Sequence, residues 1–440
     1  MVENVKHIIA NSLPYRIVIV ECYSSAVNYI HDLRVRSCEP ILLERFVPEA
    51  EQAKVRSVND AAYAFNGDSC PAVLTAKENY ADTLEMIRAL SPGLVLPGSD
   101  AGIELALRLS EDLQLKSNPF ALFPAMRDKL TMQETLKAAG LRSIASHAVT
   151  SEDEALDFFR ALGSGKAVLK PSRAAASSHV FICSSEAEIR RAYREVELFV
   201  RRRKNAAEKI VAQEYIDGEE YALDTVSCDG EHIALFGMKY RKRLCEGFGK
   251  IYDTDFYFSP SEESVRELVN YAFRVLDCLG VLYGPVHGEF MVDEKGPVLV
   301  EVNCRPAGAF QKYTFQDKVM YNHETAVALD AYFMEKEAFC AVYPKRMRLR
   351  QPAAVKHICL NEPMFVKRPK LTERLCSLAS FNYAIEYGEN RLYPKTTDLD
   401  TIAGMIYLTD PEAETVARDL ETIDTLERTG RDELFDWCRA

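Results

Sequence analysis

The stretch that decides the fold is Gly284–Gly308, GPVHGEFMVDEKGPVLVEVNCRPAG. Two runs of alternating apolar and polar residues, near 286–292 and 298–304, flank a short turn, which is the pattern of a β-hairpin. A three-residue loop at 294–296 can close this hairpin because Gly296 tolerates a positive φ angle. The sequence therefore predicts two adjacent antiparallel strands.

The register of the predicted hairpin decides which side chains meet. The three-residue loop pairs Asp293 with Pro297, and the same register places Glu289 directly opposite Glu301. Because side chains alternate between the two faces of a strand, one face is expected to be polar and the other apolar. The polar face holds His287, Glu289, Met291, Leu299, Glu301, Asn303 and Arg305. The apolar face holds Phe290, Val292, Val298, Val300, Val302 and Cys304.

Two carboxylates that face each other destabilise a sheet unless a cation neutralises them. Magnesium favours one or two carboxylates, retained waters and phosphate oxygens, and Asn303 and Arg305 stand beside the acidic pair. The alternative is a solvated strand face on which two acids meet. The hairpin alone leaves both interpretations open.

Length and composition limit the class of protein. The 440 residues suffice for two or three domains, and a net charge of −12 without a basic, aromatic stripe argues against nucleic-acid binding. The twelve cysteines lack a CxxC spacing, which suits a reducing compartment. The start has no signal-peptide layout, and no apolar run reaches membrane-spanning length. We therefore expect a cytoplasmic protein with neither nucleic-acid nor membrane partners.

The N-terminal part alternates strands and helices, which predicts a parallel sheet with ligands at the carboxyl ends of its strands. Strands are expected at residues 16–21, 40–43 and 93–97, with helices up to about 36 and at 103–113. The absence of GxGxxG after the first strand disfavours a dinucleotide site. The motif PGSDAG at 97–102 has two interpretations: Ser99 or Asp100 caps the next helix, or the loop belongs to a small-substrate site.

The middle of the chain carries two loops with polar or basic character. After an expected strand at 167–170, the small-residue loop 171–178 lets backbone amides approach phosphate oxygens, and Lys170 adds a positive charge. A basic, aromatic segment at 241–260 is expected to be a long loop, either disordered or functional. Its Arg243, together with Lys239–Arg241 before it, either binds a substrate carboxylate or phosphate or forms a solvated edge strand.

Several segments, taken in their order along the chain, resemble the ATP-grasp superfamily, particularly its carboxylate–amine ligases of the L-amino-acid ligase (dipeptide synthetase) type. The resemblance is carried by PGSDAG at 97–102, RDK at 127–129, VLKPSRAAASSHV at 168–180, QEYIDGEEY at 213–221, HGEF at 287–290 and EVNCRP at 301–306. It implies an α/β (α+β) architecture with an N-terminal parallel α/β domain, a lid, an antiparallel ATP-grasp sheet and a C-terminal lobe. The implied boundaries are 1–118, 119–350 with the lid at about 150–213, and 351–440.

The resemblance also implies ATP and Mg²⁺, with Mn²⁺ as an alternative ion, and assigns roles to particular residues. The implied metal ligands are Glu289, Glu301 and Asn303. The implied nucleotide-binding residues are Lys129, Lys170 and Ser177 at the phosphates and Glu214, Tyr215, Ile216, Glu220, Met291 and Leu299 at the nucleoside, with Glu219 as the alternative to Glu220. Arg305 and His287 are the implied catalytic residues, and a structural hydrogen bond is the alternative for His287. Residues 172–178 depart from the family's glycine-rich phosphate loop.

The implied activity joins a small-molecule carboxylic acid to an amine through an acyl-phosphate, releasing ADP and phosphate. A homodimer is the family-level expectation. Two other functions stay open: a different ATP-grasp branch, such as a purine-pathway ligase or a carboxylase, and a regulatory module that binds ATP without turnover. The strand–helix pattern of 351–440, which lacks a Met-Lys biotinylation signal, disfavours the carboxylase.

Overall fold

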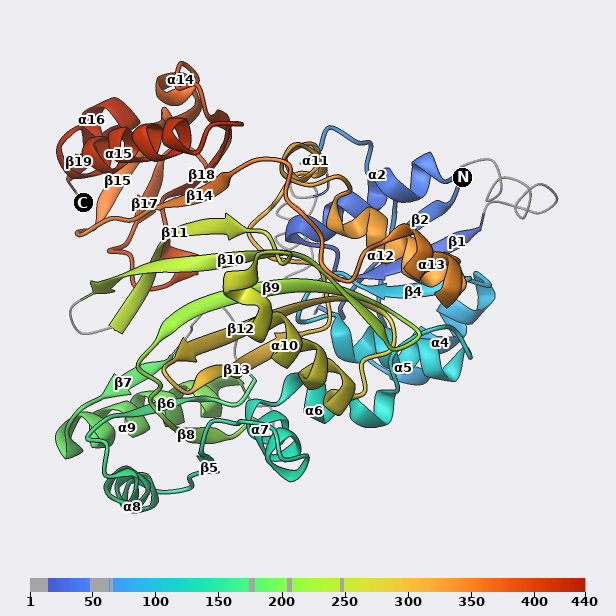
Figure 1. Ribbon diagram of the computed structural model, residues 1–440, viewed down its shortest axis with the longest axis horizontal. Helices are drawn as coiled ribbons and strands as arrows, with labels where there is room; N and C mark the ends of the chain where they lie inside the picture. The colour runs from blue at the N-terminus through green and yellow to red at the C-terminus, as the bar shows by residue number, and fades with distance from the viewer. Residues whose placement is uncertain are drawn as a thin grey trace.

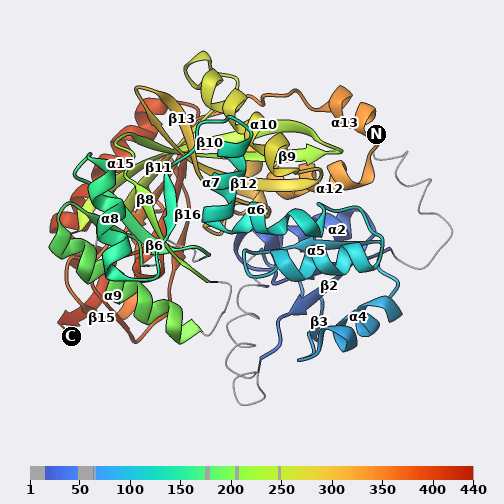
Figure 2. The same ribbon diagram turned by 90° about the horizontal axis from the view of Figure 1, so that it is seen from below.

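The structure is a computed structural model that describes residues 15–47, 63, 66–173, 179–203, 208–245 and 249–439. Figure 1 shows an N-terminal domain, a lid, a large central sheet and a C-terminal lobe. In the turned view of Figure 2, the strands of the N-terminal domain lie on the side away from the lid helices. This mixed α/β arrangement confirms the predicted fold class.

The N-terminal domain is built on a parallel sheet with strand order β3-β2-β1-β4. Its strands are β1 (Arg16–Val20), β2 (Glu39–Glu44), β3 (Ala72–Thr75) and β4 (Leu94–Pro97), and its helices are η1 (Ser24–Val27), α2 (Asn28–Val35), α4 (Tyr80–Ala89) and α5 (Ile103–Asp112). The parallel sheet was predicted, but β3 and α4 were not. Residues Ile17 to Val20 are fully buried, as a parallel strand covered on both faces requires.

The predicted N-cap of α5 is wrong. Its N-cap is Gly102, which makes no side-chain cap, rather than Ser99 or Asp100. A Cβ at Gly102 would come within 2.4 Å of the Val20 carbonyl oxygen. The close approach of this loop to β1 sets where the helix begins, and it leaves Asp100 available for another contact.

The lid is an antiparallel sheet with strand order β5-β8-β6-β7. Its strands are β5 (Ser146–Ala148), β6 (Ala167–Pro171), β7 (Phe181–Cys183) and β8 (Ile210–Glu214). Helices α8 (Glu152–Leu162) and α9 (Glu186–Arg203) pack on it around an apolar core that includes Leu156, Leu169 and Val196. Strand β6 carries Lys170 toward the central sheet.

The central sheet has eight strands in the described part of the chain, in the order β13-β12-β9-β10-β11-β14-β18-β16. They are β9 (Glu219–Cys228), β10 (Glu231–Cys245), β11 (Gly249–Phe258), β12 (Gly284–Asp293), β13 (Gly296–Asn303), β14 (Ala353–Ile358), β16 (Phe381–Glu386) and β18 (Gly404–Thr409). Three strands from the C-terminal segment thus continue this sheet, so the boundary proposed at 351 is not a break in hydrogen bonding.

The remaining elements complete the layers around this sheet. They are η2 (Phe120–Leu122), α6 (Phe123–Arg127), α7 (Lys129–Ala138), η3 (Glu263–Val265), α10 (Arg266–Leu279), α11 (Tyr313–Val319), α12 (Glu324–Phe333), α13 (Lys336–Val342), β15 (Met364–Pro369), α14 (Leu371–Leu375), β17 (Arg391–Tyr393), η4 (Leu399–Thr401), α15 (Ala413–Thr429), α16 (Arg431–Leu434) and β19 (Phe435–Arg439). None of the described helices has the length and apolar content needed to span a bilayer.

The predicted long loop at 241–260 is wrong. Its described residues form the end of β10 and all of β11, which pair antiparallel with each other. The basic side chains on this hairpin meet acids of α15, as in the ion pairs of Arg241 with Asp424 at 3.0 Å and of Arg243 with Glu427 at 2.5 Å. Local sequence resembled a solvated loop because those partners lie elsewhere in the chain.

A buried histidine, His323, joins helix α2 of the N-terminal domain to helix α11. His323 Nε2 lies 2.7 Å from Asp32 on α2, and its Nδ1 lies 2.8 Å from Asp317 on α11. Burial alone would lower the pKa of His323, but hydrogen bonds to Asp317 and Asp32 raise it from 6.5 to about 9. The charged imidazole therefore stabilises this junction.

The raised pKa of His323 at this junction predicts that the free energy of unfolding depends on pH. Because the folded-state pKa of His323 is raised, its contribution is complete below about pH 6.5 and is lost as the pH rises through about 9. The shift corresponds to roughly 3 kcal/mol. We expect the stability difference between wild type and His323→Gln, measured by urea unfolding, to shrink between pH 6 and pH 10. For the exposed control His147→Gln, the difference should stay constant; equal pH profiles for both variants would contradict the assignment.

Candidate active site

The central hairpin confirms the predicted meeting of two acids but corrects its register. Glu289 pairs with Glu301, as expected, whereas Asp293 pairs with Gly296 rather than Pro297. The turn is therefore one residue shorter than predicted, and a register shift after Glu289 compensates for it. Gly296 has a φ of +94°, which fits the tight turn.

The register shift reverses the faces of one part of β13. Leu299 pairs with Phe290 and is buried in the core under α10, so the prediction that Leu299 lines the nucleotide site is wrong. Val300 lines the cleft instead, together with Met291. Met291, Val298 and Val300 pack with Ile144 and Ile216 into a small apolar cluster. Met291 and Ile216 thus lie together, as predicted for an adenine-binding surface.

The cleft above this hairpin has a volume of about 970 Å³ and reaches from the lid to the C-terminal lobe. All predicted site residues in the described part of the chain line it except Leu299: Lys129, Lys170, Glu214, Tyr215, Ile216, Glu220, His287, Glu289, Met291, Glu301, Asn303 and Arg305. Ser177 lies outside the described residues. Residues separated by up to 176 positions, from Lys129 to Arg305, therefore meet in one cavity.

The acidic pair has the donor set of a divalent-cation site. Asn303 Nδ2 donates to Glu301 Oε1 at 3.3 Å, whereas Asn303 Oδ1 is buried and has no partner among the described residues. Lys129 forms an ion pair with Glu301 and so supplies a positive charge there. Burial alone would raise the pKa of Glu301, but Lys129 and the nearby Lys170 and Arg127 lower it to about 2. These oxygens fit Mg²⁺, which prefers carboxylate and carbonyl ligands.

Lys170 brings a second positive charge to the cleft from the lid. Its side chain is buried, and burial together with the neighbouring Lys129 lowers the pKa of its ammonium to about 8. An anion placed between the two lysines would relieve this repulsion. The pair is therefore suited to a polyphosphate, as the sequence predicted.

His287 is held by Asp224, a residue that the sequence analysis did not single out. His287 Nδ1 lies 2.8 Å from Asp224, and its Nε2 lies 3.6 Å from Glu289. Burial would lower the pKa of His287, but Asp224 and Glu289 raise it to about 10. A charged His287 therefore orients Glu289 and offsets part of the negative charge of the acidic pair.

Arg305 is fixed by a two-point contact with the N-terminal domain. Its Nε and Nη2 donate to the carboxylate of Asp100 at 3.2 and 3.1 Å. Burial would lower the pKa of Arg305, and Asp100 raises it, so the guanidinium stays charged within the cleft. Asp100 therefore positions Arg305 instead of capping α5.

At the lid end of the cleft, Glu219 and Glu220 both line the cavity, but Glu220 is the more buried of the two. Glu220 pairs with Met291 across the sheet and forms an ion pair with Lys242 at 2.6 Å. Glu219 is largely exposed and forms an ion pair with Lys239. This geometry supports Glu220, rather than Glu219, as the ribose-binding candidate. Lys242, which lines the cleft, was missed in the sequence.

Comparison with known proteins identifies the fold around this cleft. Residues 165–312 match the family described as the ATP-grasp domain. The chain contains an ATP-grasp domain. Dapdiamide A synthase of Enterobacter agglomerans is 28% identical over 240 residues, which are 54% of this chain and 56% of that protein. The match thus spans about half the length of that curated relative.

Solved structures extend the likeness in fold beyond the ATP-grasp domain. An L-amino acid ligase from Bacillus licheniformis superposes with a TM-score of 0.71 at 16% identity, covering 98% of this chain and 100% of that one. An N5-carboxyaminoimidazole synthase from Aspergillus clavatus superposes with a TM-score of 0.68 at 13% identity, covering 94% and 99%. At these identities the comparison concerns the fold of nearly the whole chain, and not its substrate.

The basic residues of β10 are held in ion pairs, and Lys239 and Arg241, but not Arg243, line the ATP-grasp cleft. Arg243 contacts Glu427 of α15 at 2.5 Å, and Arg241 contacts Asp253 and Asp424. The structure therefore does not support the prediction that Arg243 binds substrate, because its charge is already matched by the C-terminal lobe.

Cys304 stands between two site residues of the ATP-grasp hairpin but points into the core, as predicted. Burial raises the pKa of its thiol to about 12, so it stays protonated. We expect Cys304→Ala to keep wild-type turnover and to cost about 1 kcal/mol through a small cavity. Phosphate release and urea unfolding test this; a folded but inactive variant would contradict the orientation of the strand.

Proposed function

We propose that this protein is an ATP-dependent carboxylate–amine ligase that forms an amide through an acyl-phosphate and releases ADP and phosphate. The observation that carries the proposal is the convergence of Glu289, Glu301 and Asn303 with the cations Lys129, Lys170 and Arg305 in one cleft. A protein that only bound ATP would not need this concentration of charge at the phosphate end of the site.

Within this proposal, Glu289, Glu301 and the side-chain oxygen of Asn303 would hold Mg²⁺, or Mn²⁺ in its place. The ion would supply neutralisation of the charge that develops on the transferring phosphoryl group. Lys129 and Lys170 would bind the α- and β-phosphates, and Lys129 would exchange Glu301 for a phosphate oxygen as the nucleotide enters. The nucleoside would be bound by Glu214, Tyr215, Ile216, Glu220 and Met291. Val300 would contact it at the position that the sequence predicted for Leu299.

The chemistry explains why activation precedes amide formation. A carboxylate is a poor electrophile because its leaving group would be oxide. Attack of a carboxylate oxygen on the γ-phosphorus breaks the bond to ADP and gives an acyl-phosphate. The amine then attacks the acyl carbon, phosphate departs, and the amine loses a proton to solvent or a nearby base. Arg305, held by Asp100, would stabilise the phosphoryl oxygens in both steps, and His287 would orient Glu289.

The relatives support the class of reaction. One is named as a dapdiamide synthase and another as an L-amino acid ligase, so small-molecule carboxylic acids and amines are the proposed substrates. The similar fold of the N5-carboxyaminoimidazole synthase keeps a purine-type ATP-grasp ligase open as the alternative function. Formation of an amide product distinguishes the proposed ligase from that synthase. The domain boundaries, a homodimer and a cytoplasmic location stay predictions.

A pairwise screen of amino acids tests the proposed function. Each L-amino acid is offered with each other one, with ATP and MgCl₂, and phosphate release is measured together with the mass of the product. We expect one or a few pairs to give phosphate and a dipeptide in equal amounts. Phosphate release with bicarbonate or an aminoimidazole, and none with any amino acid, would instead favour the purine-type branch.

A further inference from the structure

A buried acid–imidazole pair lines the cleft at the far side of its floor, on strands of the same sheet as the acidic hairpin. His357 Nε2 of β14 donates to Asp255 Oδ2 of β11 at 2.8 Å. Asp255 is 5% exposed and His357 is 1% exposed, yet both line the cleft. Neither residue has a role in the mechanism proposed above.

The register of the sheet shows that Asp255 faces the same side as the nucleotide-binding residues. Met291 lies opposite Glu220, Glu220 opposite Tyr240, and Tyr240 opposite Asp255. Residues directly opposite each other on paired strands share a face. Asp255 therefore ends a row of four side chains that crosses the floor of the cleft.

Two polar atoms of the pair lack a hydrogen-bond partner within the described part of the chain. Asp255 Oδ1 and His357 Nδ1 are buried without a partner among the described residues. Nε2 donates to the carboxylate, so Nδ1 is the ring nitrogen that remains for a ligand. A buried polar atom without a partner is costly, and the Asp255 oxygen at the edge of the cavity marks a place for a ligand that donates a hydrogen bond.

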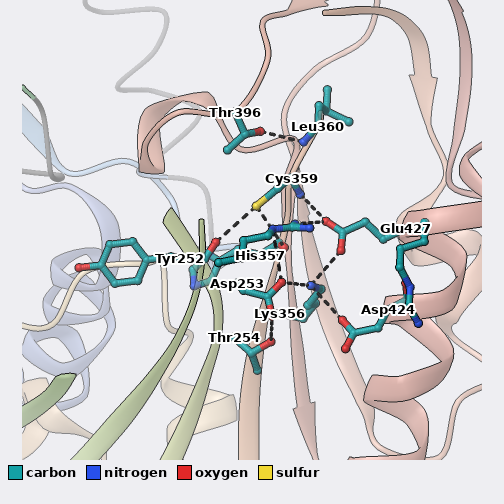
Figure 3. Close-up of polar contacts among 12 residues, drawn as sticks. Tyr252, Asp253, Thr254, Lys356, His357, Cys359, Leu360, Thr396, Asp424 and Glu427 are labelled. Atoms are coloured by element: carbon teal, nitrogen blue, oxygen red, sulfur yellow. Dashed lines mark hydrogen bonds and ion pairs between the residues drawn. The ribbon is translucent and has the colours of Figure 1, made fainter. Parts of the chain in front are cut away.

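The nearby buried Lys356 makes its ion pairs with other acids rather than with Asp255. Figure 3 shows Lys356, next to His357 in sequence, turned into a separate cluster. Its Nζ contacts Asp253 at 2.5 Å and Asp424 and Glu427 at 3.0 Å each. Among the described residues, Asp255 Oδ2 accepts from His357, and its Oδ1 is left for a hydrogen-bond donor on a ligand.

The C-terminal lobe supplies a mainly apolar wall to the same end of the cleft, where Met405 pairs with His357. The wall consists of Tyr387, Leu399, Ile402 and Met405, and the polar Thr397 and Asp400 complete it. A cationic donor beside an apolar surface fits the ammonium group of an amino acid with an apolar side chain, and it fits a second phosphate or sugar poorly.

Resting on the proposed function, we propose that Asp255 binds the α-ammonium group of the amino acid whose carboxylate is activated, with its side chain against the C-terminal-lobe wall. Three strand spacings separate Asp255 from the metal-binding strand, roughly 14 Å between backbones. A transferring phosphoryl group and one amino acid together span a gap of this order. His357 is a positioning residue that fixes the orientation of Asp255.

Trapping with hydroxylamine tests the acid site alone, because hydroxamate forms without the second substrate. Wild-type protein is given ATP, MgCl₂, hydroxylamine and each L-amino acid or its des-amino analogue, the same acid with hydrogen in place of the amino group. We expect the best amino acid to exceed its analogue in kcat/KM by roughly 10²-fold or more, the effect of leaving a buried charged group unpaired. Equal values for acid and analogue overturn the inference.

The variant Asp255→Asn keeps the contact with His357 and removes the charge. We expect its KM for the amino acid to rise roughly 10-fold to 100-fold, its KM for ATP to stay unchanged, and its preference over the des-amino analogue to disappear. Asp153→Asn on α8, where the acid is 88% exposed, is the control. In His357→Gln, whose amide nitrogen can still donate to Asp255, the KM for the amino acid should rise less than in Asp255→Asn.

The outcomes separate the inference from the proposed function. Hydroxamate from simple carboxylic acids but not from amino acids overturns the inference and leaves the ligase intact. An unchanged preference in a folded Asp255→Asn protein does the same. No hydroxamate from any acid, with no phosphate release in the pairwise screen, overturns the proposed function itself.

Discussion

Replacing Glu301 with Gln should abolish turnover, with phosphate release falling by roughly 10²-fold or more, while the protein still folds. The substitution removes one ligand charge from the proposed cation site, and with it stabilisation of the transferring phosphoryl group. It also leaves Lys129 without its carboxylate partner. We therefore expect the melting temperature to fall, because a buried charge loses its counter-charge.

Glu289→Gln is the matched control for that stability effect. Glu289 lies 3.6 Å from His287 and forms no ion pair with Lys129 among the described contacts. Its loss should reduce turnover while costing less stability than Glu301→Gln. Steady-state phosphate release and thermal unfolding of both variants test this. Two acids that only repelled each other would instead give a higher melting temperature and unchanged activity in either variant.

Arg305→Ala should suppress hydroxamate and amide alike, by roughly 10²-fold or more, because the stabilising charge is lost before the amine takes part. Trapping with hydroxylamine separates the two steps. A variant that still forms hydroxamate at the wild-type rate, but no amide, would place Arg305 on the amine side of the reaction.

Arg142→Ala controls for the loss of a paired arginine near the same hairpin. Arg142 makes a two-point contact with Asp293, at 2.7 Å for each bond, at the turn of the hairpin and away from the cation site. Both variants lose an Arg–Asp pair, so a general loss of stability affects them similarly. Only Arg305→Ala should lose activity in protein that remains folded at the assay temperature.

The sequence predicted the parts of the site that depend on local order. Period-2 alternation and a glycine turn placed Glu289 opposite Glu301 and Cys304 in the core, although the two acids meet only because the register shift offsets the shorter turn. The resemblance then added Lys129 and Lys170, which the structure brings into the same cleft.

The register shift after Glu289 could not be predicted from the sequence. A single extra residue in one strand reverses every side chain beyond it, and nothing in the run Val298–Val302 indicates where it lies. The exchange of Leu299 for Val300 in the cleft follows from that one irregularity.

The missed residues share a different cause. Asp224, Asp255 and His357 are polar residues within buried strands, and their partners are distant in sequence. The signal available was Asp224 inside the apolar run of β9, because a buried charge requires a partner. Which residue that partner is depends on strand order, and strand order is a tertiary property.

The identity of the nucleotide product tests the central claim most directly. Protein is incubated with ATP, MgCl₂ and the best pair from the screen, and the nucleotides are separated by chromatography. Attack at the γ-phosphorus, where the proposed cation ligands and Arg305 gather, predicts ADP in amounts equal to the amide. AMP with pyrophosphate would mean attack at the α-phosphorus, and it would contradict the proposed mechanism even if the amide formed.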